Sequence, residues 1–234
     1  VDVAVVGQFD SNEAVAAVGS NTAVISLIIN LFVGLAGGAN VVIANYLGRK
    51  EDEKVQNTVH GVFALGFVCS IITMFLGILI ARPVLIIMDT PVEVLEAAVL
   101  YLKIYCLGIP FIVFYNFGAA ILRSVGDTKR PLYCLILSGI LNALLNLLFV
   151  IVFKMSVAGV AVAVISNVVS AVIVIILLIK EKRIIALSLK KIKFHKRELM
   201  QVIKIGVPAG IQGMIFSIAN IFIQSAVNGF GTDA

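Results

Sequence analysis

The chain has 234 residues, of which 61% are hydrophobic and only 13% are charged. A soluble domain carries about twice that charged fraction, so this composition excludes an ordinary soluble protein. The formal net charge is +5, but the chain has no Trp and few aromatic residues beside its basic ones, which argues against a nucleic-acid-binding surface. Because the hydrophobic residues come in long runs, we expect an all-α, polytopic membrane protein.

Seven apolar runs follow one another along the chain. The first is the end of a membrane span, before a loop at residues 10–13. Six further spans are expected at residues 22–47, 58–80, 95–122, 132–153, 157–179 and 202–227. Runs of about 20 residues match a hydrocarbon core about 30 Å thick. The chain begins at Val1, without an initiator Met and already inside an apolar run, so we expect a fragment of a longer protein.

Basic residues are concentrated in every second connection between the spans. The connections after the second, fourth and sixth spans contain Arg49, Lys50 and Lys54; Arg123, Lys129 and Arg130; and Lys180, Lys182, Arg183, Lys190, Lys191, Lys193, Lys196 and Arg197. The other connections contain only Arg82, Lys103 and Lys154, beside acidic residues. Because positive residues mark the cytoplasmic side, we expect a multi-pass protein of the plasma (inner) membrane whose linker and N-terminus are cytoplasmic.

The linker between the sixth and seventh spans alternates its basic residues with Ile, Leu and Phe. Such a segment can lie on an anionic leaflet. It can also be an ordinary linker that follows the orientation rule. The sequence leaves both interpretations open. We expect His195 in this linker, and His60 at the cytoplasmic end of the third span, at the membrane interface.

Glycines and prolines recur inside the spans. Gly34 and Gly38 lie four residues apart in the second span, and Gly206 and Gly210 repeat this spacing in the seventh. Small residues at this spacing let helix backbones approach closely. Proline also interrupts the fourth and seventh spans, where it frees a backbone carbonyl and permits a bend. Close packing and a movable bend are the two interpretations of these positions.

A short internal repeat indicates the organisation of the chain. Residues 6–11 and 227–232 are alike, because each segment ends an apolar span and leads into a small polar loop. If the seventh span copies the first, the repeat unit is six spans, and both copies enter the membrane in the same direction. We therefore expect a six-helix transmembrane lobe at residues 1–180 with a truncated first helix, a basic linker at 181–201, and the first helix of a second, parallel-repeated lobe at 202–234.

One acidic residue, Asp2, lies inside a predicted span. A carboxylate at membrane depth costs about 2.5–3.5 kcal/mol on insertion scales and is usually functional. Its pKa should rise there, so that it binds a proton or a cation that stabilises its charge. Asn142 and Asn146 lie one helical turn apart in the fifth span and could complete a cation site. Hydrogen bonding between helices is their other interpretation.

Other uncharged polar residues inside the spans are expected to give a central cavity polar walls. Those that we choose as substrate-cavity residues are Asn40, Asn116, Gln212 and Gln224. The three cysteines lie in apolar runs without metal-ligand spacing. The sequence contains no phosphate-binding loop and no metal-ligand cluster. We therefore expect no enzyme, no metal site and no cofactor beyond a coupling ion.

Several stretches together resemble a known family. The most specific runs from Tyr115 to Pro131, across the turn between the fourth and fifth spans. The others are residues 1–2, 6–9, 14–19, 37–40, 47–48 and 141–146. They resemble the multidrug and toxic compound extrusion (MATE) family of efflux transporters. This resemblance implies twelve helices in two six-helix lobes around a central cavity, coupled to the inward flow of H⁺ or Na⁺.

The resemblance also assigns roles to three residues. Asp2 matches the first-helix aspartate that many members use for cation coupling, and Asn142 matches the fifth-helix asparagine of the same site. Asn146 stands where several members have aspartate, and a threonine often found in the sixth helix is absent. One carboxylate in place of two is compatible with H⁺ or with weakly held Na⁺.

We therefore expect a cation-coupled antiporter that exports small, cationic or amphipathic organic compounds by alternating access and is a monomer when full length. Its partners would be the organic substrate, the coupling cation and the lipid bilayer, without nucleic acid. Two alternatives stay open. One is a lipid-linked saccharide flippase of the same superfamily, which tends to carry cations in its cavity; only Lys103 and Lys204 are candidates here. The other is a membrane scaffold without transport.

Overall fold

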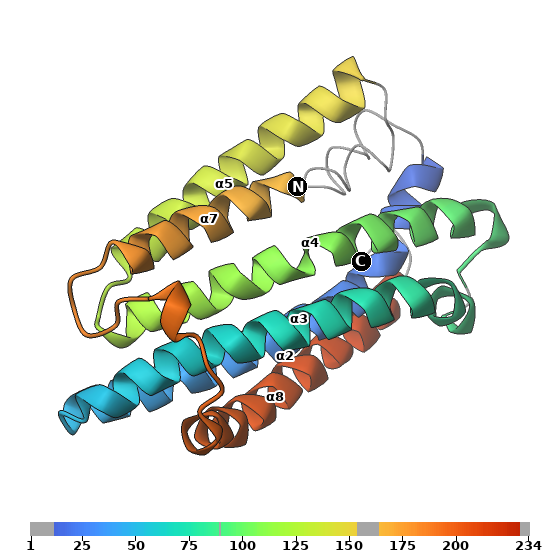
Figure 1. The fold of residues 1–234 in the computed structure, drawn as a ribbon. Coiled ribbons are helices and arrows are strands. Elements are labelled where there is room, and N and C mark those ends of the chain that lie inside the picture. Colours follow the sequence, from blue (N-terminus) through green and yellow to red (C-terminus); the bar gives the residue numbers. More distant parts are fainter. Residues whose placement is uncertain (1–11, 89, 154–163, 230–234) are drawn as a thin grey trace.

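A computed structural model describes residues 12–88, 90–153 and 164–229, and it describes their side chains except at 12–15, 152 and 220–229. Within these ranges all regular elements are helices, which confirms the predicted all-α fold (Figure 1). They are α2 (Asn12–Gly48), α3 (Asp52–Ile87), α4 (Val92–Ser124), α5 (Lys129–Leu147), the π-helical turn η1 (Leu148–Val152), α7 (Ile165–Ile179), the short 3₁₀ helix η2 (Leu189–Lys191) and α8 (Lys196–Gly229).

Five of these helices, α2, α3, α4, α5 and α8, are long and apolar enough to cross a membrane, whereas α7 is shorter. Two predicted boundaries are wrong. Asn12 and Glu13, expected in a loop, belong to the first turn of α2, and α3 continues through Pro83 to Ile87 instead of ending near residue 80. The first span, the beginning of the sixth span and most of the repeat at residues 6–11 and 227–232 lie outside the described residues.

Proline does not end any of the helices in which it was expected to permit a bend. α4 runs without a break through Pro110, and α8 runs through Pro208. Beside Pro110, a Cβ added to Gly108 would lie 2.1 Å from Cγ1 of Val164. The contact favours the close-packing interpretation at Gly108, because any side chain there would displace the neighbouring segment.

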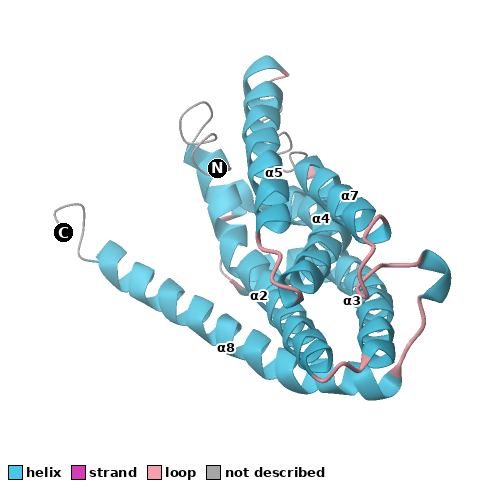
Figure 2. Cartoon of the chain, turned by 90° about the vertical axis from the view of Figure 1, so that its left-hand side faces the viewer, coloured by secondary structure: helices cyan, strands magenta, loops and turns pink. Residues whose placement is uncertain are grey.

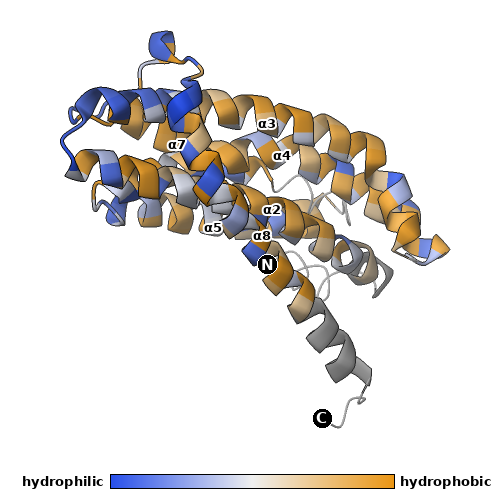
Figure 3. Ribbon diagram, turned by 90° about the horizontal axis from the view of Figure 1, so that it is seen from below, coloured by the Kyte–Doolittle hydropathy of each residue, from blue (hydrophilic) through white to orange (hydrophobic). Residues whose placement is uncertain are grey.

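The three basic connections lie together at one end of the bundle. We call this the basic end; it comprises residues 49–51, 125–128 and 180–195 (Figure 1). Arg130 joins two of the connections, because its guanidinium contacts both Asp127 in the α4–α5 turn and, at 2.6 Å, Glu181 after α7. Figure 3 shows hydrophilic residues gathered here, while the middle of the helices is hydrophobic. This distribution is the one that a membrane-spanning bundle requires.

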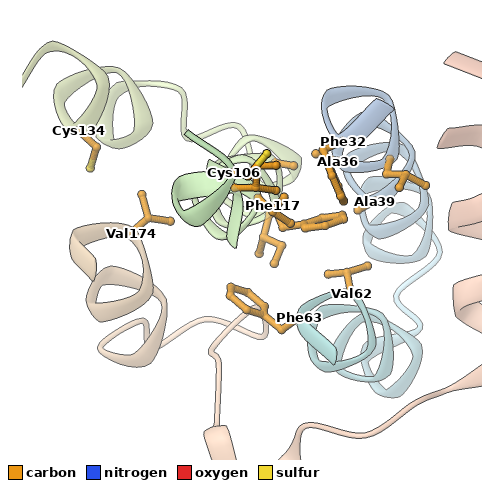
Figure 4. Packing of buried hydrophobic residues seen from close by; sticks show 14 of the residues in the cluster. Phe32, Ala36, Ala39, Val62, Phe63, Cys106, Phe117, Cys134 and Val174 are labelled. Atoms are coloured by element: carbon orange, nitrogen blue, oxygen red, sulfur yellow. The ribbon is translucent and has the colours of Figure 1, made fainter. Parts of the chain in front are cut away.

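The core is organised around α4, which contacts α2, α3 and α7. Its Phe117 is buried and packs near residues of α2 and α3 (Figure 4). Two glycines make room for this packing. A Cβ on Gly66 would lie 2.8 Å from the Phe117 ring, and a Cβ on Gly118 would lie 2.1 Å from Cγ1 of Val174 on α7. The helices can therefore pack closely at these two positions because glycine has no side chain.

Candidate functional site

A line of polar side chains follows one side of α5 at successive helical turns. Ser138 is buried and donates a hydrogen bond to the backbone oxygen of Ser166 on α7, at 3.0 Å. One turn further lies Asn142, which is half-buried, and after another turn comes Asn146, whose side chain is completely buried. Nδ2 of Asn146 donates to Oδ1 of Asn142 at 3.3 Å. The structure thus brings together the two predicted asparagines.

The chemistry of this pair suits a small cation. A carboxamide in hydrocarbon requires a hydrogen-bonding partner, and an i, i+4 pair on a helix supplies one within the same element. Carboxamide oxygens are also ligands for hard cations such as Na⁺, Mg²⁺ and Ca²⁺. Within the described residues, no group of three or more His, Cys, Asp or Glu side chains gathers as a transition-metal site would require.

The backbone changes its winding next to the asparagine pair. The π-helical turn η1 begins two residues after Asn146, and the N–H of Phe153 donates to the oxygen of Leu148 at 3.2 Å. Such wider turns are rare in helices and frequently occur at functional sites. The sequence contains no glycine or proline in this turn that would have indicated it.

The third predicted member of the cation site, Asp2, lies outside the described residues. The described part of the chain supplies two carboxamides on α5, and the carboxylate that would complete the site is part of the predicted first span. A shared site of Asp2, Asn142 and Asn146 stays a prediction. The segment of the sixth span in which the family often has a threonine also lies mostly outside the described residues.

The structure describes the side chains of three of the four predicted substrate-cavity residues. Asn116 donates to the backbone oxygen of Ile112 in its own helix, at 2.8 Å, and Asn40 is half-buried on α2. Gln212 is exposed and lines a hollow of about 480 Å³ on α8, while the side chain of Gln224 lies outside the described residues. Their common cavity stays a prediction.

α2 and α8 make the most extensive contact between two helices in the structure. A Cβ on Gly34 would lie 2.2 Å from the backbone nitrogen of Gly210, and a Cβ on Gly38 would lie 2.6 Å from the oxygen of Val202. On the other side, a Cβ on Gly206 would lie 2.7 Å from Cα of Leu35. The backbones touch directly, so the close-packing interpretation of the two glycine pairs is confirmed. We call this contact the glycine seam.

Two polar contacts that the sequence did not predict lie at the ends of the glycine seam. The Tyr46 hydroxyl donates to Oε1 of Gln201 at 2.8 Å, near the basic end. Nδ2 of Asn30 donates to the Ser217 hydroxyl at 2.6 Å, at the middle of α2. Figure 2 shows α8 leaving the bundle away from the basic end. The sequence shows these polar residues inside apolar runs, but it does not show which residues they contact, because the partners are 155 and 187 positions away.

The linker packs against α3 in a way that neither sequence interpretation anticipated. Ile185 and Leu187 of the linker are buried, and Ser188 donates its backbone N–H to Nε2 of His60 at 3.0 Å. The Nδ1 atom of His60 lies 2.7 Å from the backbone oxygen of Gln56. His60 does lie at the basic end, as expected for an interfacial residue, but the linker covers it.

The basic end also contains a well-bonded carboxylate. Arg130 donates to Glu181, and the backbone N–H groups of Lys182 and Arg183 donate to the other oxygen of the same carboxylate at 3.0 and 3.3 Å. These hydrogen bonds, that from Arg130 above all, lower the pKa of Glu181 below its ordinary value. Glu181 therefore fixes the start of the linker against the α4–α5 turn.

Comparison with known proteins identifies the family to which this bundle belongs. The MatE family model matches residues 1–148. The chain belongs to the MatE family. This confirms the resemblance found in the sequence, and it agrees with a multi-pass membrane transporter fold.

The MatE chain is similar to named bacterial proteins along its whole length. It is 29% identical to the probable multidrug resistance protein YoeA of Bacillus subtilis, over all of this chain and 52% of that protein. It is 26% identical to the multidrug export protein MepA of Staphylococcus saprophyticus, over 90% of this chain and 48% of that protein. The chain thus spans about half the length of the curated relatives it matches.

Solved structures give the same result. The MatE chain superimposes on a crystal structure of MATE in the bent conformation with a TM-score of 0.90 and 26% identity, over 99% of this chain and 52% of that one. It also superimposes on the outward-facing conformation of a multidrug resistance MATE transporter with a TM-score of 0.88 and 26% identity, over 96% of this chain and 50% of that one.

Proposed function

We propose that this MatE chain forms the amino-terminal part of an antiporter that exports small, cationic or amphipathic organic compounds in exchange for H⁺ or Na⁺. Relatives named for multidrug resistance and multidrug export support the substrate class. The observation that carries the coupling half of the proposal is the hydrogen-bonded pair of Asn142 and Asn146 inside a membrane helix, beside a π-helical turn.

In the proposed mechanism, Asp2 takes up the cation from the outer side and releases it inside. Neutralisation of a buried carboxylate removes an unfavourable charge from hydrocarbon, so binding changes which arrangement of its helix is the more stable. Asn142 and Asn146 would supply neutral oxygen ligands, which stabilise the cation without adding charge. Each transport cycle would then exchange one bound cation for one expelled organic molecule.

The glycine seam supports alternating access between two lobes. It holds α2 of the first lobe against α8 near the basic end, which we assign to the cytoplasm because basic connections mark that side. When the seam is closed at this end, α2 and α8 are in contact as far as the hydrogen bond between Asn30 and Ser217, and α8 then leaves the bundle. This arrangement would keep a cavity open to the outside. Separation of the seam would open the same cavity to the cytoplasm.

The test is dye efflux from cells that carry the full-length protein. We expect Asp2→Asn to abolish efflux, because it removes the only carboxylate of the site, and Asn146→Leu to reduce it at least tenfold. The matched control is Asn45→Leu, which changes an exposed asparagine of α2 and should leave efflux near the wild-type rate. Unchanged efflux in Asp2→Asn, at equal expression, would reject Asp2 as the coupling residue.

A further inference from the structure

The linker between α7 and α8 is a folded part of the molecule. Its backbone is held by two side chains of α3: Nε2 of Gln56 donates to the oxygen of Ile184, and Nε2 of His60 accepts from the N–H of Ser188. Its Ile185 is completely buried. The linker therefore has a fixed place beside α3 and the end of α7, from which its other side chains project.

Two hollows that differ in the charge of their lining meet at the linker. The larger has a volume of about 1110 Å³, and we call it the polar hollow because most of the side chains that line it are polar or charged, although apolar side chains line it too. The linker contributes Lys190, Lys191 and Lys193 to its wall. The smaller, of about 440 Å³, is almost entirely apolar and lies between the linker, α3, α4 and α7. Both hollows are lined by Leu187, Leu189 and Lys193, so they adjoin each other.

The polar hollow has an excess of positive charge. Its two carboxylates, Asp52 and Glu53, come from the first turn of α3 and oppose three lysines, with His60 and His195 beside them. Among the described residues, none of these three lysines takes part in an ion pair. The wider segment at residues 180–197 carries eight basic residues and one acidic residue, Glu181, which is already paired with Arg130. The unpaired positive charges of this segment therefore favour the binding of an anion.

The apolar hollow has the lining that an acyl chain requires. Four phenylalanines line it: Phe63, Phe67, Phe114 and Phe194. The rings of Phe63 and Phe67 each stack with that of Phe114, with centroids 6.1 and 6.4 Å apart. Phe67 and Phe194 are 55% and 60% exposed, so the hollow opens towards the space that lipid fills around a membrane bundle.

We propose that the linker and the adjoining hollow between α3, α4 and α7 bind one anionic phospholipid of the adjacent leaflet. Its phosphate lies against Lys190, Lys191 and Lys193, and one acyl chain lies along the four phenylalanines. An anionic amphiphile matches this arrangement, because its headgroup suits the hollow with three lysines and its acyl chain suits the adjoining apolar hollow. Each lysine contributes about 1 kcal/mol to attraction by an anionic lipid, which is about fivefold in affinity.

The site is tested by lipid binding to the full-length protein purified in detergent, measured by native mass spectrometry. Dioleoyl phosphatidylglycerol and dioleoyl phosphatidylcholine are compared, with glycerol phosphate as a headgroup without acyl chains. We expect at least tenfold tighter binding of phosphatidylglycerol than of either other ligand. Equal binding of the two lipids, or glycerol phosphate binding as tightly as phosphatidylglycerol, would overturn the proposal.

One matched pair of triple variants separates the site from general attraction to basic residues. Lys190→Gln/Lys191→Gln/Lys193→Gln should weaken phosphatidylglycerol binding at least tenfold. The control Lys180→Gln/Lys182→Gln/Lys196→Gln removes the same charge from lysines outside both hollows and should weaken it less than threefold. An equal loss in the two triple variants would mean attraction by a polybasic segment alone, which contradicts the proposed site.

The acyl-chain half of the site has its own comparison. Phe67→Ser/Phe194→Ser changes two exposed rings that line the apolar hollow, and we expect it to weaken phosphatidylglycerol binding several-fold. Phe75→Ser changes a ring on α3 that is 58% exposed and lies outside this hollow, and it should leave binding unchanged. If Phe67→Ser/Phe194→Ser binds phosphatidylglycerol like the wild type, the apolar hollow is not the acyl-chain site.

Discussion

Some polar side chains in this protein bond to partners that are distant in sequence. Asn21 is an example that the sequence did not single out: it is completely buried on α2, and its Nδ2 donates both to Ala17 in its own helix and to Ala98 on α4, at 2.8 and 3.0 Å. The hydrogen bond between Asn142 and Asn146, in contrast, joins two residues of one helix. A pair one turn apart is visible in a sequence, whereas a partner 77 residues away is not.

Glu181 gives a prediction at the residue scale. Glu181→Gln removes the charge that pairs with Arg130 and should lower the free energy of unfolding by about 1–2 kcal/mol near pH 7. The pKa of Glu181 is lowered by Arg130, so this stabilisation is present above the ordinary glutamate pKa, about 4.3, and is lost as the pH falls through the lower, folded-state pKa. The melting temperatures of the two proteins should therefore differ at pH 7, and the difference should shrink as the pH falls below the ordinary glutamate pKa and vanish once the carboxylate is protonated in the folded state.

The control for this measurement is Glu96→Gln, which removes the partner of Arg82 at the other end of the bundle. There both side chains are well exposed, at 72% and 59%, and exposed ion pairs contribute little. A melting temperature that differs equally in both variants, or a difference for Glu181→Gln that does not shrink as the pH is lowered through the acid range, would contradict the role given to the Glu181 carboxylate.

At the scale of the helix, the apolar runs in the sequence correctly predicted which helices exist among the described residues and in what order they follow. The described helices follow the predicted spans, and the glycine spacing in α2 and α8 predicted close packing, because both depend only on periodic or cumulative properties of the sequence. Boundaries were less predictable. Arg82 and Pro83 resemble the end of a span, yet α3 continues past them, since a helix can extend beyond the hydrocarbon when its end is solvated.

The glycine seam gives a prediction at this scale. Gly34→Ala places a methyl group 2.2 Å from the backbone of α8, which cannot move aside as a side chain would, so we expect a loss of about 1–3 kcal/mol and a lower melting temperature. Gly37→Ala is the matched control. A Cβ at Gly37 has no neighbour within 4 Å among the described residues, and the better helix propensity of alanine should leave stability unchanged or slightly raised. Equal melting temperatures in the two variants would argue against direct backbone contact.

For the whole molecule, the basic connections that charge predicted to share one side of the membrane do share one end of the bundle. The three basic connections, distant in sequence, lie at one end of the bundle. What the sequence could not predict is that the third of them folds back on α3, because hydrogen bonds from Gln56 and His60 to linker backbone atoms leave no pattern in either segment. The predicted cation site likewise combines residues that are far apart in the sequence, because Asp2 and the two asparagines come from different predicted spans.

The proposed separation of α2 from α8 during transport can be tested by locking the glycine seam. A Cβ on Gly213 would lie 3.4 Å from Cβ of Asn30, close to the roughly 3.5–4.5 Å of a disulfide, so Asn30→Cys/Gly213→Cys should cross-link on oxidation. If the seam must open in each cycle, the oxidised full-length protein exports no dye, and a reducing agent restores export. The single variants treated with the same oxidant control for Cys69, Cys106 and Cys134, which are free thiols in the wild type. Undiminished export by fully cross-linked protein would show that transport does not require this seam to open, and failure to cross-link would contradict the arrangement of the two helices.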